Sequence, residues 1–276
     1  MDITKSYWKH LNSLASILAL MFSCDAFPRD VNIPNFPLDV DGPNYFYEHI
    51  LNLALAKASV DGEQDYLNKV SISGGTPRLF LTLLNSKKLD VIWGDYIPPD
   101  TEELIAVDFN LLRGLNRSRA LIVKNDRYAR NDEFFDKKNR SNISYGVYKY
   151  SHDADILKRN GYKYSTSLDI NLLLKMLYAD RFDCLIVGVQ DAQYLVESNK
   201  HLNLIVLPDY MLSSDNYNFT FYLHTRNRIL AQKILRGLNL LVKSGEFDLQ
   251  FKKNLNLKRA FVIQKTVTMI PMLDAP

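Results

Sequence analysis

The sequence predicts an α/β protein built of two lobes. The first observation is that segments with helical spacing of apolar residues alternate with short apolar strands along most of the chain, which is typical of a mostly parallel sheet. The second is the length of 276 residues, which suits two lobes of ordinary size. The third is a pair of strand segments, 119–125 and 218–227, placed where the chain can pass between lobes and return. This layout implies a cleft that closes by a hinge motion.

The composition is that of a folded protein with a mixed surface. Apolar residues make up 47% of the chain and charged residues 24%, and the net charge is +3 with acids and bases interspersed. This is enough apolar material for a proper core, and the charge is too mild for a dedicated nucleic-acid surface. We therefore expect no nucleic-acid partner, and we expect a monomer.

Residues 1–26 are predicted to be a secretory signal peptide. Two lysines precede the apolar run 11–22, and small residues follow it, with a plausible cleavage site near Ala26. The run is too short to span a bilayer comfortably. A buried first helix is the alternative, and lipid anchoring at Cys24 is another, disfavoured because Phe22 is bulky for a lipidation signal. We expect export to the periplasm.

Cys184 is the other cysteine of the chain. If the leader is removed, no disulfide framework is possible. Cys184 lies within an apolar strand, so we expect a buried and unreactive thiol.

The first expected lobe comprises residues 27–118 and 225–276. Its helices are predicted by apolar residues at helical spacing, and the helix over 76–88 also has Pro77 at its start and lysines at its end. Its strands are predicted by short apolar or alternating runs that end at glycines. In chain order we expect a strand and loop over 30–43, a helix over 44–60, a strand over 66–74, the helix over 76–88, a strand over 89–96, and a helix pair over 228–254 divided at Gly245.

The second expected lobe, residues 119–224, is an insertion in the first. Its strands are short apolar runs, and its helices follow them with core-spaced leucines or a glycine stop. In chain order we expect strands over 119–125 and 144–150, a helix over 152–162, a strand over 163–167, a helix over 168–181, a strand over 182–188, a helix over 191–199 and strands over 202–208 and 218–227.

The order of these segments resembles the periplasmic solute-binding proteins of family 3, the amino-acid-binding type with the type II fold. More narrowly it resembles a divergent branch known as transporter substrate-binding domain proteins. That branch shows an Asp-Val-Ile-Trp strand, a Lys-Gly-Leu step and a Gly-Arg-Phe-Asp segment. The corresponding segments here are Asp90–Trp93, Arg113–Leu115 and Asp180–Asp183.

The resemblance implies an exported protein that closes around a small polar solute, with an ABC-type permease as its membrane partner. The alternative is a free-standing sensory module of the same fold that signals to a membrane receptor. A hydrolase that has reused the fold is a third reading. The five histidines show no metal-ligand spacing, and no nucleophile or phosphate-binding motif occurs, so we expect no enzyme activity, no metal and no cofactor.

Two departures from the family concern the ligand. Amino-acid binders hold the ligand carboxylate with an arginine in a Thr-x-Glu-Arg segment, and this chain has Leu104 at that position. They hold the ligand amine with an aspartate five residues after Asp183, and this chain has Gly188 there. Because burying unpaired charges costs several kcal/mol or more, a standard α-amino acid is not the expected ligand.

Candidate ligand-binding residues follow the predicted strands of the first lobe. Trp93, Asp95 and Tyr96 follow one strand, where an aromatic ring can stack on a ligand and a carboxylate can accept hydrogen bonds. The alternative is core packing for Trp93 and a turn for Asp95. Arg78, in another strand-to-helix turn, is a candidate for a ligand carboxylate or phosphate, or else a solvated residue of a helix's first turn.

In the second lobe the candidates lie at two strand-to-helix junctions. Tyr150 and Ser151 precede a helix whose first N–H groups can bind an anion, and an ordinary N-cap is the alternative use of Ser151. Gly188 and Gln190 follow the strand over 182–188, at the carboxyl end where α/β proteins bind ligands.

Overall fold

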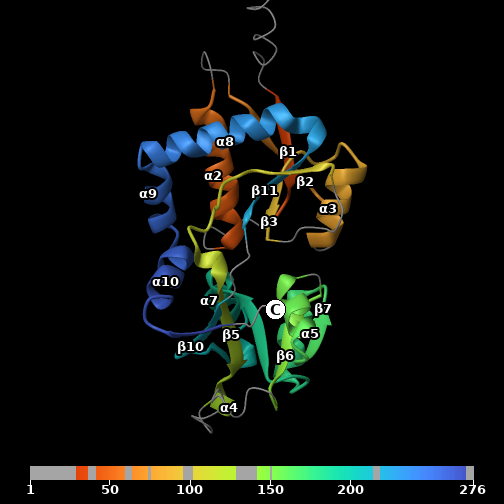
Figure 1. Cartoon of the computed structure of the whole chain (residues 1–276), viewed down its shortest axis with the longest axis vertical. Coiled ribbons are helices and arrows are strands. Elements are labelled where there is room, and N and C mark those ends of the chain that lie inside the picture. The colour runs from red at the N-terminus through yellow and green to blue at the C-terminus, as the bar shows by residue number, and fades with distance from the viewer. Residues whose placement is uncertain are drawn as a thin grey trace, which may run out of the picture.

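The computed structural model describes residues 29–36, 42–59, 64–73, 76–95, 102–128, 142–149, 151–213 and 218–271. They form two lobes, one above the other, with helices running along one side from the upper to the lower (Figure 1). We call the lobes upper and lower as they stand in that view. The predicted two-lobed α/β fold is confirmed. The predicted leader, with Cys24, lies outside the described residues, as do Tyr96 and Tyr150.

The upper lobe contains two small sheets covered by helices. One sheet is a parallel strand pair and the other has an antiparallel order, β3-β11-β4. The elements are β1 (Asp30–Pro34), α2 (Pro43–Lys57), β2 (Tyr66–Val70), α3 (Thr76–Asn85), β3 (Ile92–Gly94), β4 (Leu104–Ala106), β11 (Thr220–His224), α8 (Arg228–Lys243) and α9 (Glu246–Lys253).

The lower lobe is built on a larger mixed sheet with the order β12-β10-β5-β8-β6-β7, and β9 also pairs with β5. Strands β6, β7 and β8 run parallel, whereas β5 runs antiparallel to β8. The elements are β5 (Ser118–Lys124), α4 (Asn125–Tyr128), β6 (Ser144–Tyr148), α5 (His152–Arg159), β7 (Lys163–Ser167), α6 (Ile170–Tyr178), β8 (Cys184–Gly188), α7 (Val189–Ser198), β9 (Leu204–Val206), β10 (Tyr210–Ser213), α10 (Leu255–Ile263) and β12 (Thr268–Pro271).

The chain passes between the lobes three times. It descends between β4 and β5, returns between β10 and β11, and descends again through α9 and α10 to β12. The predicted division at residues 119 and 225 placed β11 in the second lobe and β12 in the first. Strand pairing differs at both places, because β11 is the central strand of the upper sheet and β12 pairs in parallel with β10 of the lower. The rest of that division stays a prediction.

Most of the expected elements form, and five α-helices and β-strands of the described residues were not anticipated, namely α4, β4, β10, α10 and β12. Three of them, α4, β4 and β10, are only three or four residues long, and α10 and β12 lie beyond the predicted helix pair, which ends at residue 254. The helix pair does divide at Gly245, whose φ of 75° is in the left-handed region that favours glycine. Cys184 is buried, as predicted, and its burial raises the pKa of the thiol well above its ordinary value.

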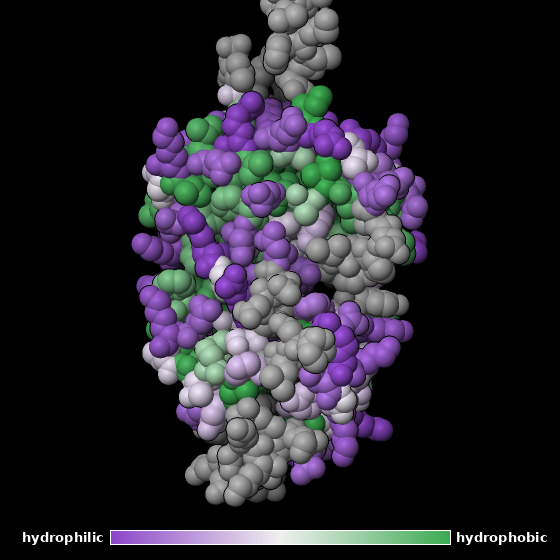
Figure 2. Space-filling model, viewed as in Figure 1, coloured by the Kyte–Doolittle hydropathy of each residue, from purple (hydrophilic) through white to green (hydrophobic). Residues whose placement is uncertain are grey.

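The core is continuous across the waist of the molecule. One cluster of buried apolar side chains extends from Ile50 and Leu238 in the upper lobe to Leu185 and Val189 in the lower. Hydrophilic residues cover much of the face in Figure 2, with hydrophobic residues gathered mainly on the upper lobe. In the part of the chain that the structure describes, no helix combines the length and the apolar character needed to span a membrane.

Helices α2 and α8 pack against each other at a glycine. A Cβ added at Gly237 of α8 would lie 1.9 Å from the carbonyl oxygen of Ala54 in α2. The side chain is therefore absent where the two backbones come closest, and the core of the upper lobe depends on this contact.

Gly237→Ala will lower the free energy of unfolding by about 1–3 kcal/mol, because the methyl group forces the helices apart. Alanine is otherwise the better helix former by about 1 kcal/mol, so the sign of the effect is diagnostic. Urea unfolding followed by circular dichroism measures it. The control is Leu240→Ala at an exposed position of the same helix, with an expected change within about 0.5 kcal/mol; an equal effect of both would contradict the close contact.

Candidate functional site

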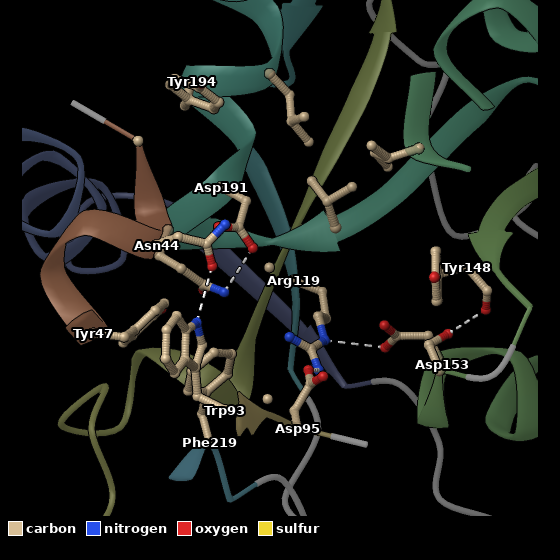
Figure 3. A pocket seen from close by; sticks show the side chains of 18 of the residues that line it. Asn44, Tyr47, Trp93, Asp95, Arg119, Tyr148, Asp153, Asp191, Tyr194 and Phe219 are labelled. Atoms are coloured by element: carbon tan, nitrogen blue, oxygen red, sulfur yellow. Dashed lines mark hydrogen bonds and ion pairs between the residues drawn. The ribbon is translucent and has the colours of Figure 1, made fainter. Parts of the chain in front are cut away.

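A cavity of about 440 Å³ lies between the lobes and is lined by residues of both. Its size is in the range of small-ligand sites. The upper lobe contributes mainly aromatic side chains, and the lower lobe contributes the start of β5, the ends of β6 and β8 and the starts of α5 and α7. Figure 3 shows these side chains converging on one space. The lining includes Asn44, Tyr47, Trp93, Asp95, Arg119, Ser151, Asp153, Gly188, Gln190, Asp191 and Phe219.

Arg119, near the start of β5, is the central charge of this cavity. Its side chain is only 2% exposed, and its guanidinium bonds two carboxylates. Nη2 donates to Oδ2 of Asp95 at 2.9 Å, and Nε donates to Oδ1 of Asp153 at 3.1 Å. Asp95 follows β3 of the upper lobe and Asp153 belongs to α5 of the lower lobe, so this ion-pair group joins the lobes across the cavity (Figure 3).

Aromatic side chains form the upper wall of the cavity. Tyr47 and Phe219 stack with ring centroids 4.5 Å apart, and Trp93 lies against Tyr47 at 6.2 Å. The indole N–H of Trp93 donates to Oδ1 of Asn44 at 2.9 Å, which fixes the ring. Because Trp93 is anchored on both its apolar and its polar side, the wall is a preformed surface.

The start of α7 forms the opposite wall. Gly188 ends β8 and is the N-cap of α7, with no side chain to cap the helix. A Cβ at Gly188 would lie within 2.3 Å of Nε2 of Gln190, so the glycine makes room for the folded-back amide of Gln190. That amide donates from Nε2 to Oδ2 of Asp191 at 2.9 Å. The sequence thus places a carboxamide two residues and a carboxylate three residues after Gly188.

Asp191 has an unusual protonation equilibrium. Burial, followed by the nearby charge of Asp95, raises the pKa of its carboxyl from 3.8 to about 7, although Arg119 and the Gln190 hydrogen bond act in the opposite direction. Burial also raises the pKa of Tyr47 well above 10, helped by the charges of Asp191 and Asp95. Asp191, Asp95, Arg119, Gln190 and Tyr47 all line the same cavity, so their charges act on one another.

The structure brings five of the predicted residues to this cavity. Trp93, Asp95, Ser151, Gly188 and Gln190 all line it. Ser151 is also the N-cap of α5: Ala154 N donates to its Oγ at 3.2 Å, so the alternative use that the sequence suggested is present as well.

Arg78 is the described candidate that the structure does not bring to the cavity. It is exposed in the first turn of α3 and is absent from the lining, so the alternative interpretation, a solvated residue, fits it better. Tyr96 and Tyr150 lie outside the described residues.

Sequence reasoning missed Arg119, Asp153 and Asp191, which are the other charged residues of the described lining, and Tyr47 of the aromatic wall. Arg119 opens an apolar strand and Tyr47 lies inside an amphipathic helix, so each pattern indicated structure and not a site. One signal was available. An arginine in an otherwise apolar strand that is buried must have an anionic partner, which would have pointed to the aspartates that end or follow neighbouring elements.

The arrangement suits binding more clearly than reaction chemistry. Within the described ranges, no group of three or more His, Cys, Asp or Glu side chains is arranged to hold a metal ion. The carboxylates are arranged around a guanidinium and an aromatic wall, and Cys184, the described thiol, is buried in the sheet. What the cavity offers a solute is hydrogen bonding, charge and ring stacking.

No protein-family model and no curated protein matches the sequence. Solved structures do match the fold. The GluR0 ligand-binding core from Nostoc punctiforme, in complex with L-glutamate, has a TM-score of 0.59 at 12% identity and covers 83% of this chain and 100% of its own. The glutathione-import protein GshT of Streptococcus mutans has a TM-score of 0.59 at 16% identity, over 83% and 95%.

A third similar structure is the ancestral amino-acid-binding protein AncCDT-1, a precursor of cyclohexadienyl dehydratase. Its TM-score is 0.55 at 16% identity, over 87% of this chain and 98% of that one. The chain has the two-lobed fold of the family 3 solute-binding proteins. At these identities the likeness concerns the fold, and the evidence for a ligand is the cavity of this chain itself.

Within this solute-binding fold, the charged groups of the cavity come from unexpected positions. Position 104, where amino-acid binders place an arginine, holds Leu104 in β4. The arginine of the cavity is Arg119 instead, from the other lobe, and β5 pairs Arg119 directly with Gly188, where amino-acid binders place an aspartate. The missing anchors therefore do not leave the cavity uncharged.

Arg119→Met will lower the free energy of unfolding by roughly 3–5 kcal/mol, because it leaves the buried Asp153 without its cation. Urea unfolding at pH 7 measures the change. Arg259→Met is the matched control: its ion pair with Glu197 is 40% and 44% exposed, and we expect at most about 1 kcal/mol. Similar losses for both variants would contradict the central role of Arg119.

Asp191→Asn will stabilise the protein at pH 8, and the gain will shrink as the pH is lowered toward 4. The pKa of Asp191 is about 7 in the folded protein against an ordinary 3.8. The folded state therefore binds more protons than the unfolded state between these values, and stability falls as pH rises through that range. Thermal unfolding of both proteins at several pH values measures this. A pH-independent difference would contradict the raised pKa.

Proposed function

We propose that this chain is an extracytoplasmic solute-binding protein that closes around a small polar ligand. The observation that carries the proposal is the cavity between the lobes, lined from both sides and joined across by the Arg119–Asp95 ion pair. A ligand in this position contacts both lobes at once only when the cleft is closed. Ligand binding then favours the closed conformation, which is the population shift by which such proteins act.

The Arg119–Asp95 pair is one interaction through which a ligand could change the stability of the closed conformation. It is a charge-assisted hydrogen bond between lobes, and Asp95 is the more exposed partner, with 34% of its side chain accessible. A bound ligand can strengthen closure by adding contacts beside the pair, or compete with Asp95 for Arg119. In either case the solute acts on the same interaction that holds the cleft together.

We further propose that the protein is exported to the periplasm and delivers its ligand to an ABC-type transporter. The lysine-flanked apolar run at 11–22 supports export, and the similar protein GshT is described with import through an ABC importer. A binding role is favoured over an enzymatic one, because Arg119 engages Asp95 and Asp153, two of the three carboxylates in the described lining of the cavity.

A thermal-shift screen of the protein against amino acids, amines, peptides, organic acids and phosphates tests the proposal. At least one small solute will raise the melting temperature by mass action. The shift will be reduced in Tyr194→Ala, which removes part of the cavity lining, and retained in Tyr164→Ala, at an exposed position of β7. The absence of a shift with every solute, or equal shifts in both variants, would contradict a solute-binding role for this cavity.

A further inference from the structure

The cavity has an excess of negative charge. Its described lining holds three carboxylates, Asp95, Asp153 and Asp191, and one cationic side chain, Arg119. Arg119 is engaged by two of the carboxylates. Asp191 has no ion pair among the described residues; its hydrogen-bond donor there is the amide of Gln190. With all three carboxyls ionised, the charged side chains of this described lining sum to −2, and Asp191 is the carboxylate left without an ion pair there.

Two buried oxygens beside Asp191 also lack a partner. Gln190 is 3% exposed and Tyr47 is 2% exposed, and within the described residues neither Oε1 of Gln190 nor Oη of Tyr47 has a hydrogen bond. Gln190 contacts Asp191 directly, and Tyr47 is close enough for the charge of Asp191 to raise its pKa. Oε1 can only accept a hydrogen bond and Oη can accept one. Unsatisfied buried acceptors next to an unpaired carboxylate call for a donor with several protons.

The aromatic wall adds a further attraction for a cation. Tyr47, Trp93 and Phe219 present ring surfaces to the same space (Figure 3), and their mutual stacking holds them in place. A cationic group near such faces is stabilised by the ring quadrupoles, most strongly where water is excluded.

The same features oppose an anionic or zwitterionic ligand. Among the described residues of the lining, the cation available to a ligand carboxylate is Arg119, and the ligand would compete with Asp95 and Asp153 for it. A carboxylate that lost its bond to Arg119 in this way would be destabilised, because a buried charge needs a partner of opposite sign. A cation without a carboxylate avoids this cost.

We propose that the cavity binds a small organic cation without a free carboxylate, whose ammonium or guanidinium group lies against Asp191, Gln190 Oε1 and Tyr47 Oη. This inference rests on the proposed solute-binding function and names the ligand class of the same site. The cation completes the ion pairing of Asp191 and satisfies the two oxygens, while its carbon skeleton lies on the aromatic wall.

Binding of such a ligand depends on the protonation of Asp191. Burial, followed by the charge of Asp95, raises the pKa of this carboxyl to about 7, and Arg119 and the Gln190 hydrogen bond act in the opposite direction. Asp153 and Tyr47 line the same cavity. The cation binds the ionised form, so affinity falls as pH drops below 7 and levels off above it. The slope is at most about tenfold per pH unit for one titrating group.

The experiment compares matched amines and amino acids by isothermal titration calorimetry. The pairs are agmatine with arginine, tyramine with tyrosine and putrescine with ornithine, which differ only in the α-carboxylate. We expect at least one amine to bind, and to bind about tenfold or more tightly than its amino acid. The ammonium groups stay protonated from pH 6 to 8, so the pH dependence of the amine affinity reports on Asp191.

Variants locate the cation. Asp191→Asn will abolish amine binding or weaken it at least about tenfold and remove the pH dependence, and Tyr47→Phe, which deletes only Oη, will weaken binding several-fold. Asp248→Asn, at a surface ion pair on α9, is the control and will change neither. Circular dichroism and unfolding curves will show whether each variant is folded, which Asp191→Asn is expected to be.

The outcomes separate this inference from the proposed function. If arginine, tyrosine or ornithine binds as tightly as its amine, or if only organic acids or uncharged solutes of the wider screen bind, the ligand class is wrong and the solute-binding function stands. An amine affinity unchanged in Asp191→Asn also overturns the inference. If no solute binds at all, the proposed function itself fails.

Discussion

The buried guanidinium of Arg119 is the interaction on which this structure depends. It lies at the start of a central strand of the lower sheet, is almost inaccessible to water and bonds one carboxylate from each lobe. A buried charge is tolerated only with compensating partners, so the positions of Asp95 and Asp153 are constrained by that of Arg119. Because one partner belongs to each lobe, the same requirement that stabilises the interior also sets the relation between the lobes (Figure 1). Fold and site therefore share a single electrostatic constraint.

Asp191, the third carboxylic acid of the described lining, is a group whose cost in stability is consistent with a role in ligand binding. Asp191 is held where ionisation is unfavourable, with Gln190 as its hydrogen-bond donor. The two unsatisfied oxygens near it carry a similar cost. Natural proteins retain such groups where a ligand repays the cost on binding, and strained or poorly satisfied groups are common at functional sites. With these groups the free energy of unfolding is lower than it would be with an apolar cavity of equal size. The same groups would let the cavity distinguish between ligands.

Much of the fold could be predicted from the sequence because long amphipathic segments such as α8 have an unambiguous helical period, and Gly245 divides α8 from α9 as expected. Strand β4 and strand β10 could not be predicted, since three or four residues carry little periodic signal. The residues of the site were likewise predictable only in part. Trp93, Gly188 and Gln190 were found because they lie at or next to the carboxyl ends of strands, where α/β folds bind ligands. Arg119 and Tyr47 were missed because strand and helix patterns indicate whether a side chain is buried, but not which groups it contacts.

The third passage of the chain between the lobes has a mechanical meaning. The first strand, β1, belongs to the upper lobe and the last, β12, adds to the edge of the lower sheet beside β10. Two connections alone would let the lobes both bend and twist about each other. A third, built from two helices packed along one side, leaves mainly bending away from that side, and the shared apolar core at the waist resists shear. We therefore expect the two lobes to unfold together and the cleft to open in one preferred direction.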